Sequence, residues 1–334
     1  MRMQRMMASF IFLALLALLG ACGPATDISD SESPAADISD SECDRACLVA
    51  LMDQYLNALA KHDPSGLPLA ENVKFTEDTA AIPIGDGLWV TTTGGPTDFK
   101  IYVADPVNGQ VGFMGLIEEN NNPAILTARL RLENSQITEV EHLVVRNVGE
   151  RALPNLQTPR PGLIQPLDPS ERVPREQMLE AANLYYEALE QDSGKVAPFA
   201  DECQRRENGI TTANNREPLP KPPPEGQPNL SVFGRMSCSD QLDTNIMSYI
   251  TKLDERRLLV VDEEMGLVLG FSMFVHRGDL KERKIIGVPG IESMPYTSGA
   301  FNLPAAHIYK IRNGKIYEIE AVGIRLPYGS KSGW

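Results

Sequence analysis

The chain has 334 residues and carries 31 Lys and Arg against 45 Asp and Glu, which gives a formal net charge of -14. Hydrophobic residues make up 42% of the chain and charged residues 23%, a composition that excludes a mostly disordered or fibrous protein. The acidic balance argues against a nucleic-acid partner, because phosphate contact needs a basic face. The 6% aromatic content also argues against a platform for stacking bases.

The N-terminus has the pattern of an export signal. Two arginines precede an apolar run over residues 10–19, which is too short to span a bilayer but fits a signal-peptide core. The run leads into Leu-Gly-Ala-Cys22, which resembles the bacterial lipobox. That resemblance implies removal of residues 1–21, lipidation of Cys22 and anchoring in the cell envelope, with Gly23 favouring the periplasmic side of the outer membrane. An ordinary secretory signal and a retained N-terminal anchor are the alternatives.

Residues 22–42 are predicted to be a disordered tether. The segment nearly repeats the sequence Asp-Ile-Ser-Asp-Ser-Glu and is acidic and poor in apolar side chains. It therefore cannot bury enough surface to order itself.

The cysteines agree with export. Besides Cys22 there are four, and an even number in an oxidising compartment suggests disulfides. Cys43 and Cys47 share one face if they are helical, which pairs Cys203 with Cys238 by elimination. A zinc site is the alternative, but the C-x3-C spacing lacks a second pair or a histidine nearby, so no metal is expected.

The chain contains a diverged duplication that is visible from its helices onward. Helical patterns over residues 47–63 and 175–191 have the same apolar phase, which matches Tyr55 with Tyr185 at an offset of 130 residues. Residues 70–77 match residues 200–207 at the same offset, so Glu77 and Glu207 occupy equivalent places. The neighbouring Arg205 and Arg206 are expected to neutralise Glu202 or Glu207.

Further along the chain the offset grows in steps. Residues 105–109 match 262–266 at an offset of 157, and residues 129–137 match 308–316 at an offset of 179. The steps predict two insertions in the second copy, which include loops near residues 216–228 and 277–299. A stepwise offset supports duplication better than any single match does.

Alternating side chains predict the strands that follow each helix. His307 and Tyr309 share one strand face, while Ile308 and Lys310 share the other, and Asn313-Gly314 is a strong hairpin signal. Closing strands are predicted over residues 137–145 and 316–324. Helices first and long antiparallel strands after them describe an α+β fold, in which a curved sheet wraps around N-terminal helices. The predicted domains cover residues 43–150 and 171–334, joined by a Pro-rich linker over residues 151–170 that is expected to be semi-extended.

These residues carry a resemblance to known proteins. The helix with Tyr55, Leu59 and Asp63, the following Ala-Glu-Asn-Val-x-Phe and the late hairpin resemble the SnoaL-like and ketosteroid-isomerase-like members of the nuclear transport factor 2-like superfamily, here as a tandem pair. The segments 43–48, 85–89, 207–209 and 326–334 resemble a bacterial and fungal family of unknown function. The resemblance implies two cone-shaped domains, each with a pocket inside its curled sheet. The superfamily hosts isomerases, dehydratases, epoxide hydrolases, lyases and non-catalytic binders.

The resemblance also implies roles for particular side chains. Tyr55 and Tyr185 would enter the two pockets as hydrogen-bond donors, and Glu77 and Glu207 would be the bases. The superfamily's second acid position falls on His307 in the second copy and on Ala128 in the first, which is a departure from the isomerase pattern.

His142 is expected to compensate for that departure in the first copy, because it shares an inward strand face with Val140 and Val144; its second-copy equivalent is Ala321. Trp89 and Tyr309 are candidate ligand contacts. The structural alternative for all of these residues is that the aromatic and imidazole rings pack in a core and the glutamates hold turns.

The resulting hypothesis is an envelope lipoprotein that binds a small, largely apolar organic molecule. A carboxylate in an apolar cone is a stronger base, and a neighbouring phenol or imidazole stabilises charge on a substrate oxygen. Glu207 with Tyr185 and His307 would then support lyase, isomerase, hydratase or other hydrolytic chemistry without a cofactor. The alternative is a non-catalytic binding or scaffold protein whose two domains pack together as an intrachain pseudo-dimer.

Overall fold

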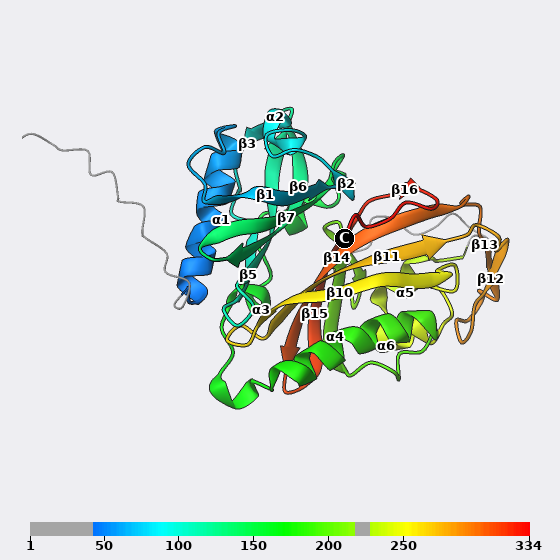
Figure 1. The fold of residues 1–334 in the computed structure, drawn as a ribbon. Coiled ribbons are helices and arrows are strands. Elements are labelled where there is room, and N and C mark those ends of the chain that lie inside the picture. Colours follow the sequence, from blue (N-terminus) through cyan, green and yellow to red (C-terminus); the bar gives the residue numbers. More distant parts are fainter. Residues whose placement is uncertain (1–42, 218–227) are drawn as a thin grey trace, which may run out of the picture. The chain divides into compact units, whose positions relative to one another are not determined.

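The structure is a computed structural model that describes residues 43–217 and 228–334 (Figure 1). The predicted signal peptide, the lipidation site Cys22, the tether and most of the predicted loop near residues 216–228 lie outside the described residues. Within the described ranges, no helix has the length and apolar character needed to cross a membrane.

The first half of the described chain, residues 43–150, is one helix packed on a curled sheet. Helix α1 (Arg45–Ala60) begins after Asp44, whose carboxylate accepts the Cys47 N–H and so caps the helix. The sheet order is β2-β1-β7-β6-β5-β3, with β4 also paired to β5. The elements are β1 (Leu69–Glu77), β2 (Ala80–Ala81), α2 (Leu88–Thr91), β3 (Thr92–Gly94), β4 (Lys100–Asp105), β5 (Gln110–Glu119), β6 (Asn122–Glu133) and β7 (Gln136–Val145).

The second half, residues 171–334, repeats this plan with helix α4 (Arg175–Glu190) on a sheet of order β10-β11-β14-β15-β8-β9. In both halves the first long strand pairs in parallel with the last one, β1 with β7 and β8 with β15, and the other neighbours run antiparallel. The strands are β8 (Phe199–Glu207), β9 (Ile210–Ala213), β10 (Lys252–Asp262), β11 (Leu267–His276), β14 (Phe301–Arg312), β15 (Lys315–Gly323) and β16 (Leu326–Pro327).

The element bounds confirm the duplication at the predicted offsets. Both ends of α1 and α4, and of β1 and β8, differ by 130 residues, and both ends of β5 and β11 differ by 157. Both ends of β6 and β14 differ by 179. The fold is therefore α+β with two tandem curled sheets, each wrapped on its own helix (Figure 1).

Two insertions distinguish the second half, at the places where the offset changes. The first contributes α5 (Ser231–Arg235) and α6 (Cys238–Leu242), and the second contributes the hairpin β12 (Glu282–Lys284) and β13 (Ser293–Pro295). The insertions pack on one another through a small apolar cluster that includes Phe233, Ile246 and Ile291. The Cys203–Cys238 disulfide ties α6 to β8, and the other predicted disulfide, Cys43–Cys47, is also present.

The connecting segment, residues 151–170, differs from the expected semi-extended linker. It forms three short helical turns, η1 (Leu153–Leu156), α3 (Pro161–Ile164) and η2 (Pro169–Glu171), each with proline in its first two positions. Proline is tolerated there because the first turn of a helix leaves its N–H groups unpaired in any case. Leu156 and Leu163 are buried, so this segment packs against both halves.

The outer faces of the two sheets pack against each other around apolar side chains from both halves, among them Ile101, Ile125, Leu269 and Ile308. Ion pairs join the same surfaces: Arg45 Nε lies 2.9 Å from Asp262 Oδ2, and Arg175 Nη2 lies 2.5 Å from Asp105 Oδ2.

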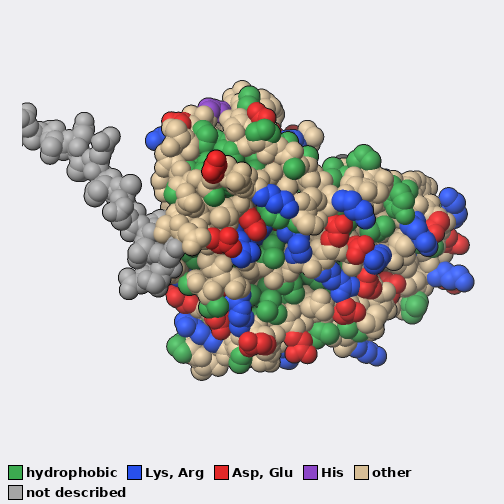
Figure 2. Space-filling model, viewed as in Figure 1, with side chains coloured by type: hydrophobic (Ala, Val, Ile, Leu, Met, Phe, Trp, Pro, Cys, Tyr) green, Lys and Arg blue, Asp and Glu red, His purple; other side chains and the backbone are tan. Residues whose placement is uncertain are grey.

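These two ion pairs are reciprocal, because Arg45 and Arg175 are equivalent at the 130 offset and Asp105 and Asp262 at the 157 offset. Each aspartate also accepts a backbone N–H from the other half, from Val261 and Ala104 respectively. Contacts that are repeated in this way are typical of a two-fold dimer interface. On the face drawn in Figure 2, acidic and basic side chains are interleaved.

Candidate functional site

A pocket of about 210 Å³ lies inside the second sheet. Its lining is mainly apolar and aromatic, and it brings together the three residues that the sequence predicted for a second-half site: Tyr185 from α4, Glu207 from β8 and His307 from β14. Their convergence follows from the register, in which Glu207 opposes Ala321 and Ala321 opposes His307 across neighbouring strands.

Burial fixes the protonation states of two of these groups. Burial lowers the pKa of His307 to about 3, with a further contribution from the positive charge of Arg205, so the imidazole is neutral at neutral pH. Burial also raises the pKa of the Tyr185 phenol, which therefore keeps its proton. His307 Nδ1 lies 3.5 Å from the Tyr186 hydroxyl. The pocket thus offers uncharged hydrogen-bonding groups on an apolar wall.

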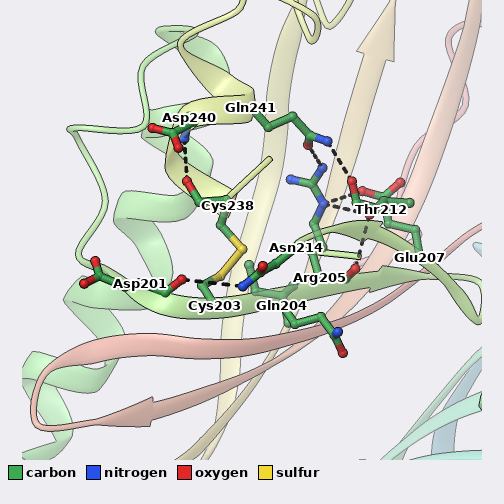
Figure 3. The surroundings of a disulfide bond; sticks show 12 residues. Asp201, Cys203, Gln204, Arg205, Glu207, Thr212, Asn214, Cys238, Asp240 and Gln241 are labelled. Atoms are coloured by element: carbon green, nitrogen blue, oxygen red, sulfur yellow. Dashed lines mark hydrogen bonds and ion pairs between the residues drawn. A yellow bond between two sulfur atoms is a disulfide. The ribbon is translucent and has the colours of Figure 1, made fainter. Parts of the chain in front are cut away.

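Glu207 has surroundings different from the poorly solvated carboxylate expected from the sequence. Its side chain is 45% exposed, and Oε1 lies 2.7 Å from Nε of the fully buried Arg205. Arg205 also hydrogen-bonds to Thr212 and Gln241, and Figure 3 shows this network beside the Cys203–Cys238 disulfide. Glu207 is therefore the counter-ion of a buried arginine at the polar end of the pocket.

In the first half, the equivalent side chains pack against one another. The Tyr55 hydroxyl hydrogen-bonds to His142 Nε2 at 2.9 Å, and Glu77 Oε2 lies 3.6 Å from His142 Nδ1. Burial acts to raise the pKa of Glu77, but the contacts with His142, the Leu88 N–H and Arg146 outweigh it and hold that pKa below its ordinary value. These groups form a closed network in the first core.

The two candidate ligand contacts are both core residues in the structure. Trp89, on α2, is 1% exposed and packs edge-on against Tyr55 with ring centroids 5.3 Å apart. Tyr309 is also fully buried, and its ring stacks on His307 at 5.7 Å. Tyr309 therefore packs against His307 in the core and does not itself line the pocket.

Three pairs of equivalent residues show why the second half has room. At the 179 offset, Leu126, His142 and Val144 of the first half correspond to Ala305, Ala321 and Gly323 of the second. All three smaller residues line the pocket, whereas their larger counterparts are buried in the first core. The same curled sheet is thus filled in one half and hollow in the other.

Part of the pocket wall was missed by the sequence analysis. Met247, Tyr249 and Ile250 come from the first insertion, which has no counterpart from which a role is inferred. Phe301, His276 and Tyr249 form a stack, with centroid separations of 4.0 Å between the first two rings and 5.5 Å between the last two. The pKa of His276 is lowered to about 4, mainly by burial, with a further contribution from the positive charge of Arg325. The alternation of residues 274 and 276 on one strand face is the signal that points to this wall.

Among the residues that the structure describes, no cluster of three His, Cys, Asp or Glu has a geometry for holding a metal ion. The four described cysteines are paired as disulfides.

A family model described as a domain of unknown function (DUF8021) matches residues 171–323. No curated protein matches the chain in sequence. A solved steroid delta-isomerase from Pseudomonas aeruginosa is similar over 33% of this chain and 88% of its own, with 17% identity and a TM-score of 0.23. Similarity at that level carries no activity over to this chain.

Proposed function

We propose that this protein binds a small, largely apolar organic molecule in the pocket of its second half, while the first half is a filled structural partner. The observation that carries the proposal is the replacement of Leu126, His142 and Val144 by Ala305, Ala321 and Gly323, which opens a pocket in one of two equivalent sheets. Hollow, apolar sites with a few converging polar groups are typical of ligand binding.

The size and chemistry of the pocket limit the ligand. A dry cavity of about 150 Å³ accommodates benzene, so a pocket of about 210 Å³ takes a body of one ring or a short alkyl chain. The neutral His307 and the Tyr185 phenol supply hydrogen bonds to one polar group on that body. Their uncharged state keeps the desolvation cost of binding low.

Filling the pocket tests this proposal. In Ala305→Leu, a pocket residue acquires the side chain that the first half carries at Leu126, and we expect at least about tenfold weaker binding of small aromatic and alkyl probes, because the added atoms occupy their space. Calorimetric titration of the probes, and native mass spectrometry of protein purified from its host, are the measurements. Ala81→Leu, at an exposed strand position, is the matched control. Equal affinities for Ala305→Leu and wild type would contradict the proposal.

A second candidate function is acid/base catalysis in the same pocket. The observation that favours it is that Glu207, Tyr185 and His307 line one cavity, as proton transfer requires. A panel of ketones, epoxides and aryl ethers tests for turnover. Loss of turnover in Glu207→Gln with the protein still folded would support an enzyme, whereas equal rates in the two proteins across all substrates would count against acid/base catalysis by Glu207.

We also propose that the chain is exported and anchored through Cys22, and that its two halves are nuclear transport factor 2-like domains over residues 43–150 and 171–334. The two disulfides support an oxidising compartment, and the shared strand order supports the common domain type. Labelling of the bacterial host with an alkyne fatty acid is expected to mark the wild-type protein and not Cys22→Ala. Labelling of both would place the lipid elsewhere.

A further inference from the structure

The pocket of the second half adjoins a groove that is lined by two arginines, Arg325 and Arg146, and by Asp78. The groove has a volume of about 590 Å³ and shares Asn208, Leu303 and Gly323 with the pocket. Arg325 lines it, and its guanidinium lies 3.8 Å from the ring centroid of Phe301, which is part of the pocket wall. A positive charge therefore lies beside the pocket mouth.

The equivalent arginine of the first half is fully neutralised. Arg146 matches Arg325 at the 179 offset. Its guanidinium binds three carboxylates, with Nη2 2.8 Å from Glu77, Nη1 2.5 Å from Asp78 and Nε 2.6 Å from Glu119. In that half the arginine is held by the protein's own carboxylates, although its side chain is 37% exposed and lines the same groove as Arg325.

In the second half, the glutamate equivalent to Glu77 does not bind Arg325. Glu207 is the equivalent residue, and it pairs with Arg205 instead. Arg205 occupies the position of Phe75, so the first half has no such competing cation.

The carboxylate that matches Asp78 has become an amide. Asn208 keeps the backbone contact, because its Oδ1 accepts the Gly323 N–H at 2.9 Å, as Asp78 Oδ1 accepts the Val144 N–H at 2.8 Å. Its remaining polar atom, Nδ2, donates to the Gly323 carbonyl at 3.0 Å, whereas Asp78 offers a second oxygen to arginine. Asn208 thus preserves the turn and supplies no charge.

The third carboxylate, Glu119, is replaced by His276, which stacks on Phe301. After these three changes, no carboxylate within residues 43–217 and 228–334 lies within 4.0 Å of the Arg325 guanidinium nitrogens. The chain is held in place around Arg325, because the Ile324 N–H donates to Pro304 O at 3.2 Å and β16 pairs with Phe301 and Asn302. The charge therefore lies over the Phe301 ring and has no carboxylate partner in the part of the chain that the structure describes.

We propose that the ligand of the second-half pocket is a small organic acid, whose apolar body fills the pocket and whose carboxylate binds Arg325. This inference rests on the proposed binding function and adds the chemical class of the ligand. A carboxylate at this place would restore the neutrality that Arg146 obtains from the protein itself. Hydrogen bonds between guanidinium and carboxylate are charge-assisted and bidentate where the geometry allows, so an acid is distinguished from its uncharged amide.

Paired probes test the inference on the full exported chain. Phenylacetate and hexanoate are each compared with their primary amides by calorimetric titration at low salt. We expect each acid to bind about tenfold more tightly than its amide, which is the usual scale of one charge-assisted hydrogen bond. In Arg325→Gln the ratio of acid to amide affinity should fall to about one. In Arg277→Gln, which removes an exposed arginine of the same half, the ratio should stay near its wild-type value.

A second variant tests the mechanism from the opposite direction. Asn208→Asp restores the carboxylate of the first half and should occupy Arg325 internally, which lowers the ratio of acid to amide affinity as Arg325→Gln does. Acids and amides that bind equally well to the wild type, or a ratio that survives Arg325→Gln, would overturn the inference while the binding function stands. Failure of all four probes to bind would overturn both.

Discussion

At the scale of single residues, the burial of His307 makes the free energy of unfolding depend on pH. The imidazole is neutral in the folded protein because its pKa is lowered to about 3, whereas an unfolded histidine titrates near 6.5. Between these two pH values the unfolded state binds more protons than the folded state. The contribution of His307 to the free energy of unfolding is therefore complete above about pH 6.5 and is lost as the pH falls towards 3.

We expect the free energy of unfolding of the wild type to fall by about 1 kcal/mol more per pH unit than that of His307→Gln between pH 6 and pH 4. Urea unfolding at pH 4, 5, 6 and 7 measures the two slopes. The other titrating groups, including Glu77, are common to both proteins and cancel in the difference. Parallel slopes would show that His307 is hydrated in the folded state.

At the scale of elements, the first insertion supports the pocket wall through the disulfide. Cys203–Cys238 ties α6 to β8 over a sequence separation of 35 residues, and Tyr249 and Met247 follow α6 into the pocket lining. Closing a loop of this length removes conformational entropy from the unfolded chain.

Replacing both cysteines of this bridge by alanine is therefore expected to lower the free energy of unfolding by about 3–4 kcal/mol. The same variant should weaken probe binding, because the insertion wall loses its tie to the sheet. Replacing Cys43 and Cys47, which close a much shorter loop, should cost less and leave probe affinity unchanged. Urea unfolding and calorimetric titration of the wild type and the two variants provide the comparison. A larger loss for the Cys43–Cys47 variant would contradict the argument.

The elements that were predicted well from the sequence are those that occur in both copies of the duplication. Two diverged copies constrain each other, so the offsets of 130, 157 and 179 located equivalent helices and strands, and strand alternation placed His142 and His307 on inward faces. Volume is less accessible from the sequence. The replacement of Leu126 by Ala305 at the equivalent position opens space only because the side chains around Ala305 do not fill it. That outcome depends on packing in three dimensions.

Charge pairing was predicted from the sequence only as a set of alternatives. Arg205 and Arg206 were expected to neutralise Glu202 or Glu207; Arg206 donates to the Asn155 carbonyl, whereas the structure joins Arg205 to Glu207. That contact decides whether Glu207 is a poorly solvated base or a counter-ion, and it depends on the inward face of β8 rather than on sequence proximity alone. The insertions contributed Tyr249 with no equivalent residue from which to infer a role.

At the scale of the whole molecule, the reciprocal ion pairs hold the two halves together. Asp105 and Asp262 are both buried, and each has one arginine partner from the opposite half. Removing a partner leaves an uncompensated charge in the interface, which costs more than the ion pair itself contributes.

Arg175→Met is expected to lower the free energy of unfolding by about 3 kcal/mol, and Arg45→Met by a smaller amount because Arg45 is more exposed. The two ion pairs are neighbours in one network, because Asp105 accepts the Val261 N–H and Asp262 accepts the Ala104 N–H. The loss in the double variant should therefore differ from the sum of the single losses by more than about 0.5 kcal/mol. Urea unfolding of the single and double variants checks both statements. A double variant no less stable than Arg175→Met would show that one bridge carries the whole interface.

The connector over residues 151–170 has a consequence for how such a protein evolves. In a homodimer encoded by one gene, every substitution changes both subunits. A cavity therefore cannot be lost from one subunit and kept in the other. Covalent joining removes that coupling and makes the encounter intramolecular. One half can then lose its pocket and become a rigid support while the other half keeps a pocket and specialises. Such a chain should bind one ligand molecule rather than two.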